Sequence, residues 1–470
     1  MRLTLPLLIV LIYMVAMLLV GYFTNKLAIK SSTDYMIAGR RMGVLMIAAS
    51  LSANNIGGGS TMGVATRAFG IWGMSAAWYV LAASVAMIPL AWFAPKIRKT
   101  MAVTIPEVVT RRFGDVAGTL TALLNIVALF FLTASQVLAS GTVVSVLTGI
   151  PMNVSILISG LVIIVYTTMG GMIADQISDL VQFFVILGGL AVALPFIVSG
   201  AGGWQAISAK LPPVKLDFFA VGWVTILGLI FNYFCTFLSG PEMVSRFSSA
   251  KDERSAQKAS VLAALLMALM AFIPTVIGLV SYAMDPALDG GKGTSALMFA
   301  TTHYAPVWVT GLIAASIVAA TMSSADSNLL CASTMLVRDL YMKYVKKEVP
   351  DRKVIFLTRC CNVFICLLSM GIALFQINIV TLNLFAFALR SAGPFAAYAF
   401  GLSVPKASRH SGLVSILVGS IAVVYWQIAH ANHPVLPIVF GCLVGTAAFF
   451  LTTFLERGNV APSAYEAKDE

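Results

Sequence analysis

Three serines and one carboxylate interrupt a long apolar run in the last third of the chain, in the stretch AATMSSADSN. On a helix, Ala320, Ser323, Ser324 and Ser327 share one stripe, and Asp326 lies on its flank. Hydroxyl and carboxylate oxygens are the ligands that a hard cation prefers. The serines could instead bond to helix carbonyls, and Asp326 could pair with a distant arginine. Because a carboxylate at membrane depth is usually kept for a function, the pattern predicts an intramembrane cation site.

Other charged side chains also fall within apolar segments. Asp175, Asp179 and Gln182 lie on one face of a predicted helix, and Asp179 is one turn deeper than Asp175, so it is the better second intramembrane carboxylate. Arg390 follows an almost wholly apolar run with no acid in its own segment. A cation in this position either neutralises a carboxylate or meets an anionic substrate, and the sequence leaves both open.

Two apolar segments carry residues that break helices. Three consecutive glycines, Gly57–Gly59, separate the halves of one segment, and Pro241 interrupts another. The breaks lie five segments apart, so the two halves of the chain enter the membrane from opposite sides as inverted copies. Paired interrupted helices indicate a transporter binding site near the midplane, where freed carbonyls coordinate an ion. The glycines could also serve close helix packing, although spaced small residues suffice for that.

The composition sets the broad class. The chain has 470 residues, of which 59% are hydrophobic and 10% charged, with a mean hydropathy of +0.93, far from the balance of a soluble domain. No alternating strand pattern competes with the apolar runs, which excludes a barrel. We therefore expect an all-α membrane protein with about thirteen transmembrane helices. The predicted segments are 5–24, 42–68, 71–94, 117–147, 152–171, 174–199, 221–245, 259–284, 307–337, 354–374, 379–403, 410–430 and 434–455.

The organisation of these segments suggests four parts. They are 1–41 (the first helix and a cytoplasmic loop), 42–199 (a first inverted repeat, helices 2–6), 200–403 (a second, helices 7–11) and 404–470 (two more helices and a cytoplasmic tail). Most of the 30 basic residues lie in alternate loops, which favours an outside N-terminus and a cytoplasmic C-terminus and explains the net charge of +11 without nucleic acid. Two amphipathic stretches, 104–113 and 246–258, are predicted to form helices in cytoplasmic loops at the membrane interface.

Together these motifs make the chain similar to the sodium:solute symporter family, which includes bacterial proline, pantothenate, sialic acid and galactose symporters. The resemblance covers nearly the whole chain. The motifs that carry it are DYMIAGRR at 34–41, the broken second segment, Gly170-Gly171 with Asp179-Leu180-Val181-Gln182, Pro241 with Arg246-Phe247, and Met322-Ser323-Ser324-Ala325-Asp326-Ser327. It implies the inverted five-helix repeat of the leucine transporter, with one extra helix before it and two after.

The resemblance also implies where sodium binds. The shared family site would use the carbonyls of Ala53, Ile56 and Ala320 and the hydroxyls of Ser323 and Ser324. A second site, which some members have, would use Asp179, Ser323, Asp326 and Ser327. One of these positions is an aspartate where the two-sodium sialic acid transporters have serine, which strengthens cation binding and leaves open whether one or two sodium ions, or a proton, are coupled.

The resemblance places the substrate beside the two broken helices. The positions it implies, together with Arg390, are Asn55, Ser60, Trp78, Gln136, Asn232, Tyr233, Phe237 and Glu242. The sequence thus predicts a sodium-coupled symporter that imports a small polar solute, an organic anion or a zwitterion, across the cytoplasmic membrane. We expect a monomer whose partners are the solute, sodium and lipid, with no nucleic acid.

Other function classes fit the sequence less well. A membrane sensor built on a transporter-like domain should carry a long cytoplasmic extension, and a channel should show a continuous polar pore. An enzyme is least favoured because no nucleophile, base and orienting group recur at one depth, and the six cysteines and four histidines show no metal-ligand spacing. A proton-coupled symporter of a neutral solute such as a sugar remains the main alternative.

Overall fold

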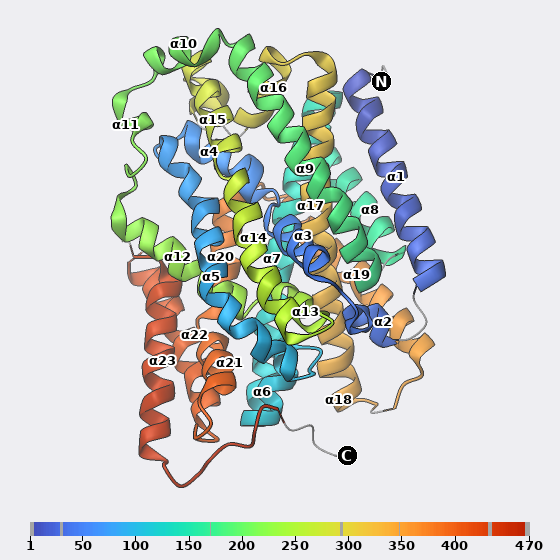
Figure 1. The fold of residues 1–470 in the computed structure, drawn as a ribbon, viewed down its shortest axis with the longest axis vertical. Coiled ribbons are helices and arrows are strands. Elements are labelled where there is room, and N and C mark those ends of the chain that lie inside the picture. Colours follow the sequence, from blue (N-terminus) through green and yellow to red (C-terminus); the bar gives the residue numbers. More distant parts are fainter. Residues whose placement is uncertain are drawn as a thin grey trace.

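The computed structural model describes residues 4–28, 32–169, 171–291, 295–346, 348–430 and 435–465. Over these ranges the chain is helical, and its β pairing is limited to two isolated bridges, Met42 with Ala250 and Ser408 with Val460. Figure 1 shows the helices as one upright bundle in which α1 begins at one end and α23 ends at the other. The predicted all-α class is therefore confirmed.

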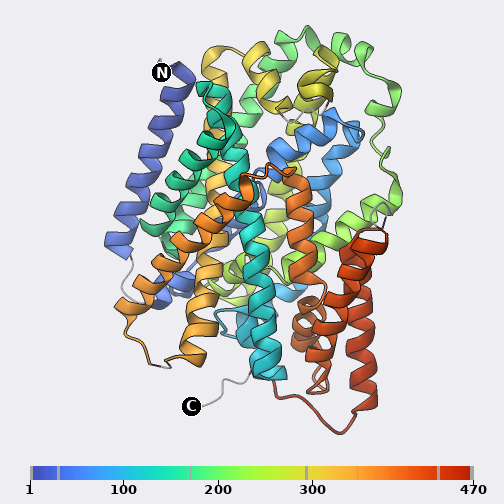
Figure 2. The same ribbon diagram turned by 180° about the vertical axis from the view of Figure 1, so that it is seen from behind.

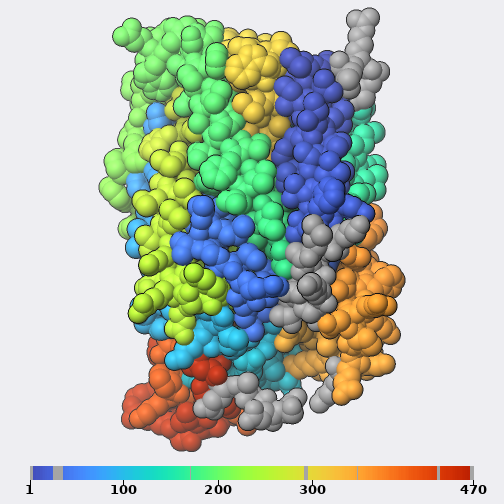
Figure 3. Space-filling model, turned by 45° about the vertical axis from the view of Figure 1, so that its right-hand side comes forward, coloured from blue at the N-terminus to red at the C-terminus, as the bar shows by residue number. Residues whose placement is uncertain are grey.

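Ten helical stretches in the described ranges are long and apolar enough to cross a bilayer. They are α1 (Leu5–Ala28), α5 (Trp78–Lys99), α7 (Asp115–Thr148), α8 (Met152–Met169), α9 (Met172–Gly200), α14 with α15 (Glu253–Met270, Phe272–Met284), α17 (Val307–Thr334), α19 (Asp351–Ala373), α22 (Ser411–Ala429) and α23 (Pro437–Leu455). Large apolar side chains such as Ile12 and Leu451, each 60% exposed, face outward. Helix α1 covers part of the outer surface (Figure 3), as expected for a surface solvated by lipid.

The two predicted helix breaks are present, and a third accompanies them. Helix α3 (Val44–Asn55) ends before the glycines, and the chain resumes through a π-turn (η2, Gly59–Gly63) into α4 (Val64–Phe69). Helices α12 (Gly222–Leu238) and α13 (Pro241–Ser248) meet at 56°. A bend of 52°, which the apolar pattern did not reveal, separates α20 (Ile379–Ser391) from α21 (Pro394–Ser403), where a proline removes the backbone donor.

The predicted number of thirteen spans is not confirmed. Counting each bent pair as one span gives at most twelve in the described ranges, because the second segment is divided and α3, with 12 residues, is too short to count alone. The limits of the two inverted repeats stay predictions.

Helix α17 forms the centre of the bundle. Every residue from Ile313 to Thr334 is buried, and the helix packs against α9, α7, α1 and α3. Small residues permit these contacts: a Cβ at Gly311 would lie 2.5 Å from the Ile9 side chain, and one at Gly189 would overlap Ser316. Helices α22 and α23 pack together at the edge (Figure 2), away from this centre.

Short helices connect the spans. They are α2 (Ser32–Ile37), η1 (Ala38–Arg40), η3 (Gly73–Ala77), α6 (Ile105–Phe113), α10 (Gly203–Lys210), α11 (Pro213–Leu216), η4 (Leu288–Gly291), α16 (Ala296–Tyr304), η5 (Met335–Tyr341) and α18 (Met342–Tyr344). Helix α6 matches the predicted stretch 104–113 and starts with Thr104 as its N-cap, whose hydroxyl accepts a hydrogen bond from the Glu107 amide at 3.2 Å. The stretch 246–258 is not an interfacial helix: Arg246 is buried at the end of α13, where carboxylates of α9 compensate its charge.

The loop between α9 and α12 folds over the end of α4. The Lys215 ammonium donates to the carbonyls of Phe69 and Gly70 at 2.6 and 2.5 Å and lies 3.7 Å from the Tyr282 ring centroid. These carbonyls at a helix C-terminus lack partners within the helix, so a cation satisfies them. Gly73 has φ +53°, and a Cβ there would be 2.5 Å from the Lys215 carbonyl oxygen. Only glycine therefore lets the backbone at position 73 lie this close to the loop.

Candidate functional site

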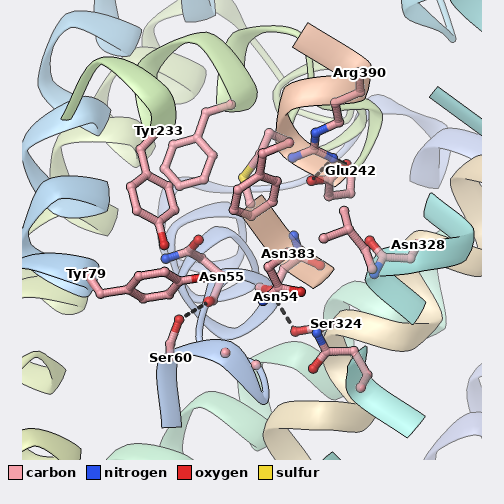
Figure 4. A pocket seen from close by; sticks show the side chains of 17 residues that line it. Asn54, Asn55, Ser60, Tyr79, Tyr233, Glu242, Ser324, Asn328, Asn383 and Arg390 are labelled. Carbon is pink, nitrogen blue, oxygen red and sulfur yellow. Dashed lines mark hydrogen bonds and ion pairs between the residues drawn. The ribbon is translucent and has the colours of Figure 1, made fainter. Parts of the chain in front are cut away.

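The break after α3 lies directly against α17. The Ser324 hydroxyl donates to the carbonyl of Asn54 at 2.7 Å (Figure 4). It also donates to the carbonyl of Ala320 at 3.1 Å. Beyond the break, the Ser60 hydroxyl donates to the Asn55 carbonyl at 2.7 Å. The backbone leaves the helix at Ile56, with ψ 67°, which frees carbonyls at this point for other partners. The geometry therefore offers carbonyl and hydroxyl oxygens of the kind that bind a hard cation.

The shared sodium site implied by the family resemblance is partly assembled. Ser324, which also donates to the Ala320 carbonyl, meets the end of α3, where Ala53 and Ile56 are both buried. The Ser323 hydroxyl instead donates to a carboxylate oxygen of Asp179 on α9. Sodium would have to draw Ser323 away from Asp179 to complete the set.

Asp179 belongs to a buried network around Arg246. The Asp179 carboxylate accepts from Arg246 Nη2 at 2.7 Å and from the Ser50 hydroxyl, and Asp175 accepts from the same Nη2 at 3.1 Å. Ser327 donates to Asp175 and accepts from Arg246. The sequence pattern missed the burial of Arg246, because this residue begins the polar, charged stretch 246–258 and the acids that face it come from another helix.

Asp326 does not join this network directly. Its carboxylate accepts from the Thr167 hydroxyl of α8, and it lines a small cavity that Asp175 and Tyr166 also line. In the described ranges, no lysine, arginine or histidine lies within ion-pair distance of Asp326. Of the four residues predicted for the second site, Asp179, Ser323 and Ser327 converge and Asp326 faces another helix.

A separate, small cavity lies beside the break, with a volume of about 40 Å³, well below the range of about 300–1,000 Å³ of small-molecule sites, so its lining must open to admit a solute. Seven of the nine predicted substrate positions line it: Asn55, Ser60, Gln136, Tyr233, Phe237, Glu242 and Arg390. It is also lined by Asn54, Tyr79, Asn328, Asn383 and Phe387, which the sequence did not point to. Figure 4 shows Tyr79 and Tyr233 on one side of it and Arg390 with Glu242 on another.

Gln136 fixes the backbone of the break. Its Oε1 accepts from the Gly58 amide at 2.7 Å, and its Nε2 donates to Ser135 at 3.1 Å. A Cβ at Gly57 would lie 2.6 Å from both Gln136 Oε1 and Ser324 Oγ. The glycines are therefore required by close approach to α7 and α17, in addition to any role in breaking the helix.

Arg390 is paired with an acid from the other broken helix. Its Nη1 donates to both carboxylate oxygens of Glu242, at 2.7 and 2.8 Å, and its Nε donates to Thr236 at 2.9 Å. Both charged side chains are buried, and the guanidinium lies 5.1 Å from the Phe387 ring centroid. The pair resolves the ambiguity that the sequence left: Arg390 neutralises a carboxylate and also faces the cavity.

The structure places two predicted substrate residues elsewhere. Trp78 donates its indole N–H to the Phe218 carbonyl at 3.1 Å and packs on the loop above α4. Asn232 faces a different, mostly apolar cavity with Phe131 and Leu436. In each case the next residue, Tyr79 or Tyr233, lines the substrate cavity, because one step along a helix turns the side chain by about 100°.

No group of three or more metal-ligating side chains of the histidine, cysteine or acidic types lies together in the described part of the chain. The six cysteines are free, and four of them are buried. These four pack in the interior, whereas Cys360 is exposed.

Comparisons with known proteins agree with this geometry. Residues 35–419 match the sodium:solute symporter family. The chain is 26% identical to the high-affinity proline transporter PutP of Bacillus subtilis, over 93% of this chain and 94% of that protein. It is 24% identical to the sodium/proline symporter of Escherichia coli, over 88% and 86%.

Solved structures show the same fold. A sodium-coupled sialic acid symporter in a substrate-bound outward-open state superposes with a TM-score of 0.82 and 21% identity, covering 98% of each chain. Mhp1, a nucleobase-cation-symport-1 transporter in a closed conformation, has a TM-score of 0.61 and 15% identity, covering 92% of this chain and 96% of that one. The predicted leucine-transporter-like fold is confirmed.

Three broken helices, a serine-bearing central helix and a buried polar cavity thus occur in a chain whose sequence matches one family over most of its length. Its relatives are secondary transporters and not enzymes. The chain belongs to the sodium:solute symporter family and is an integral membrane protein that couples sodium to the transport of a small polar solute.

Proposed function

We propose that the transported solute is a compact zwitterion. The observation that carries this proposal is the Arg390–Glu242 ion pair in the cavity wall. Among the lining residues that the structure describes, Arg390 is the only lysine or arginine and Glu242 the only acid. A purely anionic solute would meet a guanidinium that is already neutralised, whereas a zwitterion presents a group of each sign to the pair.

The uncharged lining supports the same class. Tyr79, Tyr233, Phe237 and Phe387 offer ring surfaces to an apolar body, and the side-chain amides of the cavity offer donors and acceptors. The relatives in Bacillus subtilis and Escherichia coli are named for proline, a small zwitterion with an apolar ring. L-Proline is therefore the first solute to test.

Sodium would bind at the break of α3, next to this cavity. The ligands we propose are the carbonyls of Ala53, Ile56 and Ala320 and the hydroxyls of Ser323 and Ser324. All are neutral, so the bound ion keeps a positive charge beside the cavity. Closure of the broken helix around the solute then depends on the ion, which is the coupling that a symporter needs.

The same proposal covers orientation and assembly. The basic loops favour an outside N-terminus and a cytoplasmic C-terminus in the cytoplasmic membrane. Solute would enter the cell down the sodium gradient. We further propose that the protein is a monomer. We also propose that it has no nucleic-acid partner, because most of its basic residues lie in the loops that membrane insertion keeps on the cytoplasmic side.

Uptake into proteoliposomes tests the function. With an inward sodium gradient, the wild type should accumulate L-proline in preference to a neutral sugar or a monocarboxylate, and should not do so in choline. Tyr233→Phe and Arg390→Gln should impair uptake, whereas Asn232→Leu on the same α12 helix, outside the cavity, is the matched control. Preference for a neutral sugar, with normal transport by Arg390→Gln, would refute the zwitterion proposal.

A further inference from the structure

Asn232 of α12 is a buried amide without hydrogen-bond partners. Its side chain is fully buried, and within the described part of the chain neither Oδ1 nor Nδ2 has a partner. A buried carboxamide gives up the hydrogen bonds that it makes in water, and it recovers them only from another polar group. A ligand whose polar group both donates and accepts would therefore be held by Asn232.

This amide faces an apolar cavity, which we call the Asn232 cavity. The cavity has a volume of about 430 Å³ and lies between α7, α12, α20 and the start of α23. On one wall the rings of Phe131 and Phe385 meet edge to face, with their centroids 5.0 Å apart. The lining is apolar apart from Asn232, Thr381 and Gln427, and none of the lining residues that the structure describes is charged.

The Asn232 cavity continues into the surface that faces lipid. Its lining residues Ile377 and Phe385 are 42% and 46% exposed, so the bilayer can supply an occupant. Water is a poor filling, because each buried water needs about two to four polar partners and the walls are mostly apolar. A cavity of about 150 Å³ holds one benzene, so about 430 Å³ corresponds to roughly 17 carbon atoms, which is one alkyl chain rather than two.

We propose that the Asn232 cavity binds a neutral single-chain amphiphile, such as a long-chain alcohol, and that the bound molecule inhibits solute binding. The alkyl chain fills the apolar space, and the head group donates to and accepts from the Asn232 amide. A lipid with two chains is too large for this volume. A fatty-acid anion meets no cation among the described lining residues.

The inhibition follows from a wall that two cavities share. On α12, Asn232 faces this cavity while Tyr233 lines the solute cavity (Figure 4), and on α20 Ala388 and Phe387 divide in the same way. The solute cavity, at about 40 Å³, must widen to admit a solute, and movement of α12 and α20 away from α3 would compress the Asn232 cavity. An occupied Asn232 cavity opposes that movement and favours the closed state. The inhibition, though not the site itself, rests on the proposed function.

Photolabelling tests the site independently of transport. The full chain in phospholipid nanodiscs is irradiated with a diazirine-bearing dodecanol, and labelled peptides are mapped by mass spectrometry. Label should concentrate on α12 and α20, and 1-dodecanol should displace it more effectively than n-dodecane by about 2- to 13-fold, the effect of one hydrogen bond. Asn232→Leu should remove this difference between the alcohol and the alkane. Label spread evenly over the lipid-facing helices, or an unchanged preference in Asn232→Leu, would overturn the site.

Binding of L-proline in sodium tests the inhibition. 1-Dodecanol should weaken proline binding to the wild type and should affect Asn232→Leu less. Ala388→Phe places a ring in the Asn232 cavity, so it should weaken proline binding without alcohol and leave little further effect of 1-dodecanol. Leu443→Trp, at a lipid-facing position of α23 that is 55% exposed, is the matched control and should respond as the wild type does.

The outcomes separate the two proposals. An equal effect of 1-dodecanol on the wild type and on Asn232→Leu would refute the inhibition, and Asn232→Leu alone decides if Ala388→Phe does not fold. If the protein bound no L-proline but the label still mapped to α12 and α20, the solute assignment would fail and the amphiphile site would stand.

Discussion

The ion pair in the cavity wall gives a quantitative prediction. In Glu242→Gln the Arg390 guanidinium loses a carboxylate that it meets at 2.7 and 2.8 Å, and it keeps its 2.9 Å bond to Thr236. Breaking one partner of a buried pair typically destabilises a protein by about 3–5 kcal/mol, since the other charge is left uncompensated. Because Thr236 still binds the guanidinium, we expect the lower end, about 3 kcal/mol. Arg390→Gln should cost a similar amount.

The double variant separates the pair from its surroundings. With glutamine at both positions no buried charge remains, and the two amides can bond to each other, so the loss should be about 1–2 kcal/mol. Since the single losses add to about 6 kcal/mol, the coupling energy is about 4 kcal/mol. Equilibrium unfolding in mixed micelles measures it. Asp115→Asn, which breaks a partly exposed pair with Lys343 at 2.8 Å, is the control and should cost about 0–1 kcal/mol.

The same variants alter selectivity. Glu242→Gln leaves the Arg390 charge free for the solute, so a monocarboxylate should compete with L-proline better than it does in the wild type. Additive single losses, together with unchanged competition by the anion, would refute the view that this pair sets the charge of the cavity.

Four shorter predictions follow from other contacts. Ser324→Ala removes a proposed sodium ligand, so it should raise the sodium concentration for half-maximal uptake by about 5- to 150-fold, whereas Ser333→Ala on the same helix, which bonds only locally to a carbonyl, should not. Gly57→Ala places a methyl group 2.6 Å from Ser324 and Gln136 and should abolish sodium-dependent binding in folded protein. Lys215→Met removes the contacts of the outer loop with α4, so chymotrypsin should cut that loop faster. A reporter fused after Glu470 should be active in the cytoplasm only; activity of a periplasm-dependent reporter there would reverse the topology.

Local sequence predicted much of the fold. Apolar runs of membrane length gave the spans, and Gly57–Gly59 and Pro241 marked two breaks that the structure contains. The bend before Pro394 was missed, although Gly393-Pro394 carries the same break signal as Gly240-Pro241 in the other bent segment. The number of spans also depends on how short and bent helices cross the membrane, which hydropathy does not determine.

The part of the site that lies on a single helix could be predicted from the spacing of polar residues along that helix. The serine stripe of α17 meets the broken helix through Ser324, where the family resemblance placed the two together. The direction in which a side chain points around its helix axis was predicted less well. Trp78 and Asn232 were predicted to contact the solute, but the residues that follow them, Tyr79 and Tyr233, line the cavity instead.

Partners from distant helices could not be inferred from local pattern. Arg246 lies beside a polar stretch, and its burial is explained only by Asp175 and Asp179 from another helix. Glu242 likewise meets Arg390 only through the bends of two segments. Such buried ion pairs are tertiary features whose members lie far apart in sequence, here by 67 residues or more.

The central claim is that sodium at the α3 break controls solute binding in the adjacent cavity. Equilibrium binding of radiolabelled L-proline to the purified wild type, compared in sodium chloride and in choline chloride, tests it most directly. We predict saturable binding in sodium and little in choline, and by linkage L-proline should raise the affinity for sodium by the same factor. Equal binding of L-proline in the two salts would contradict the claim.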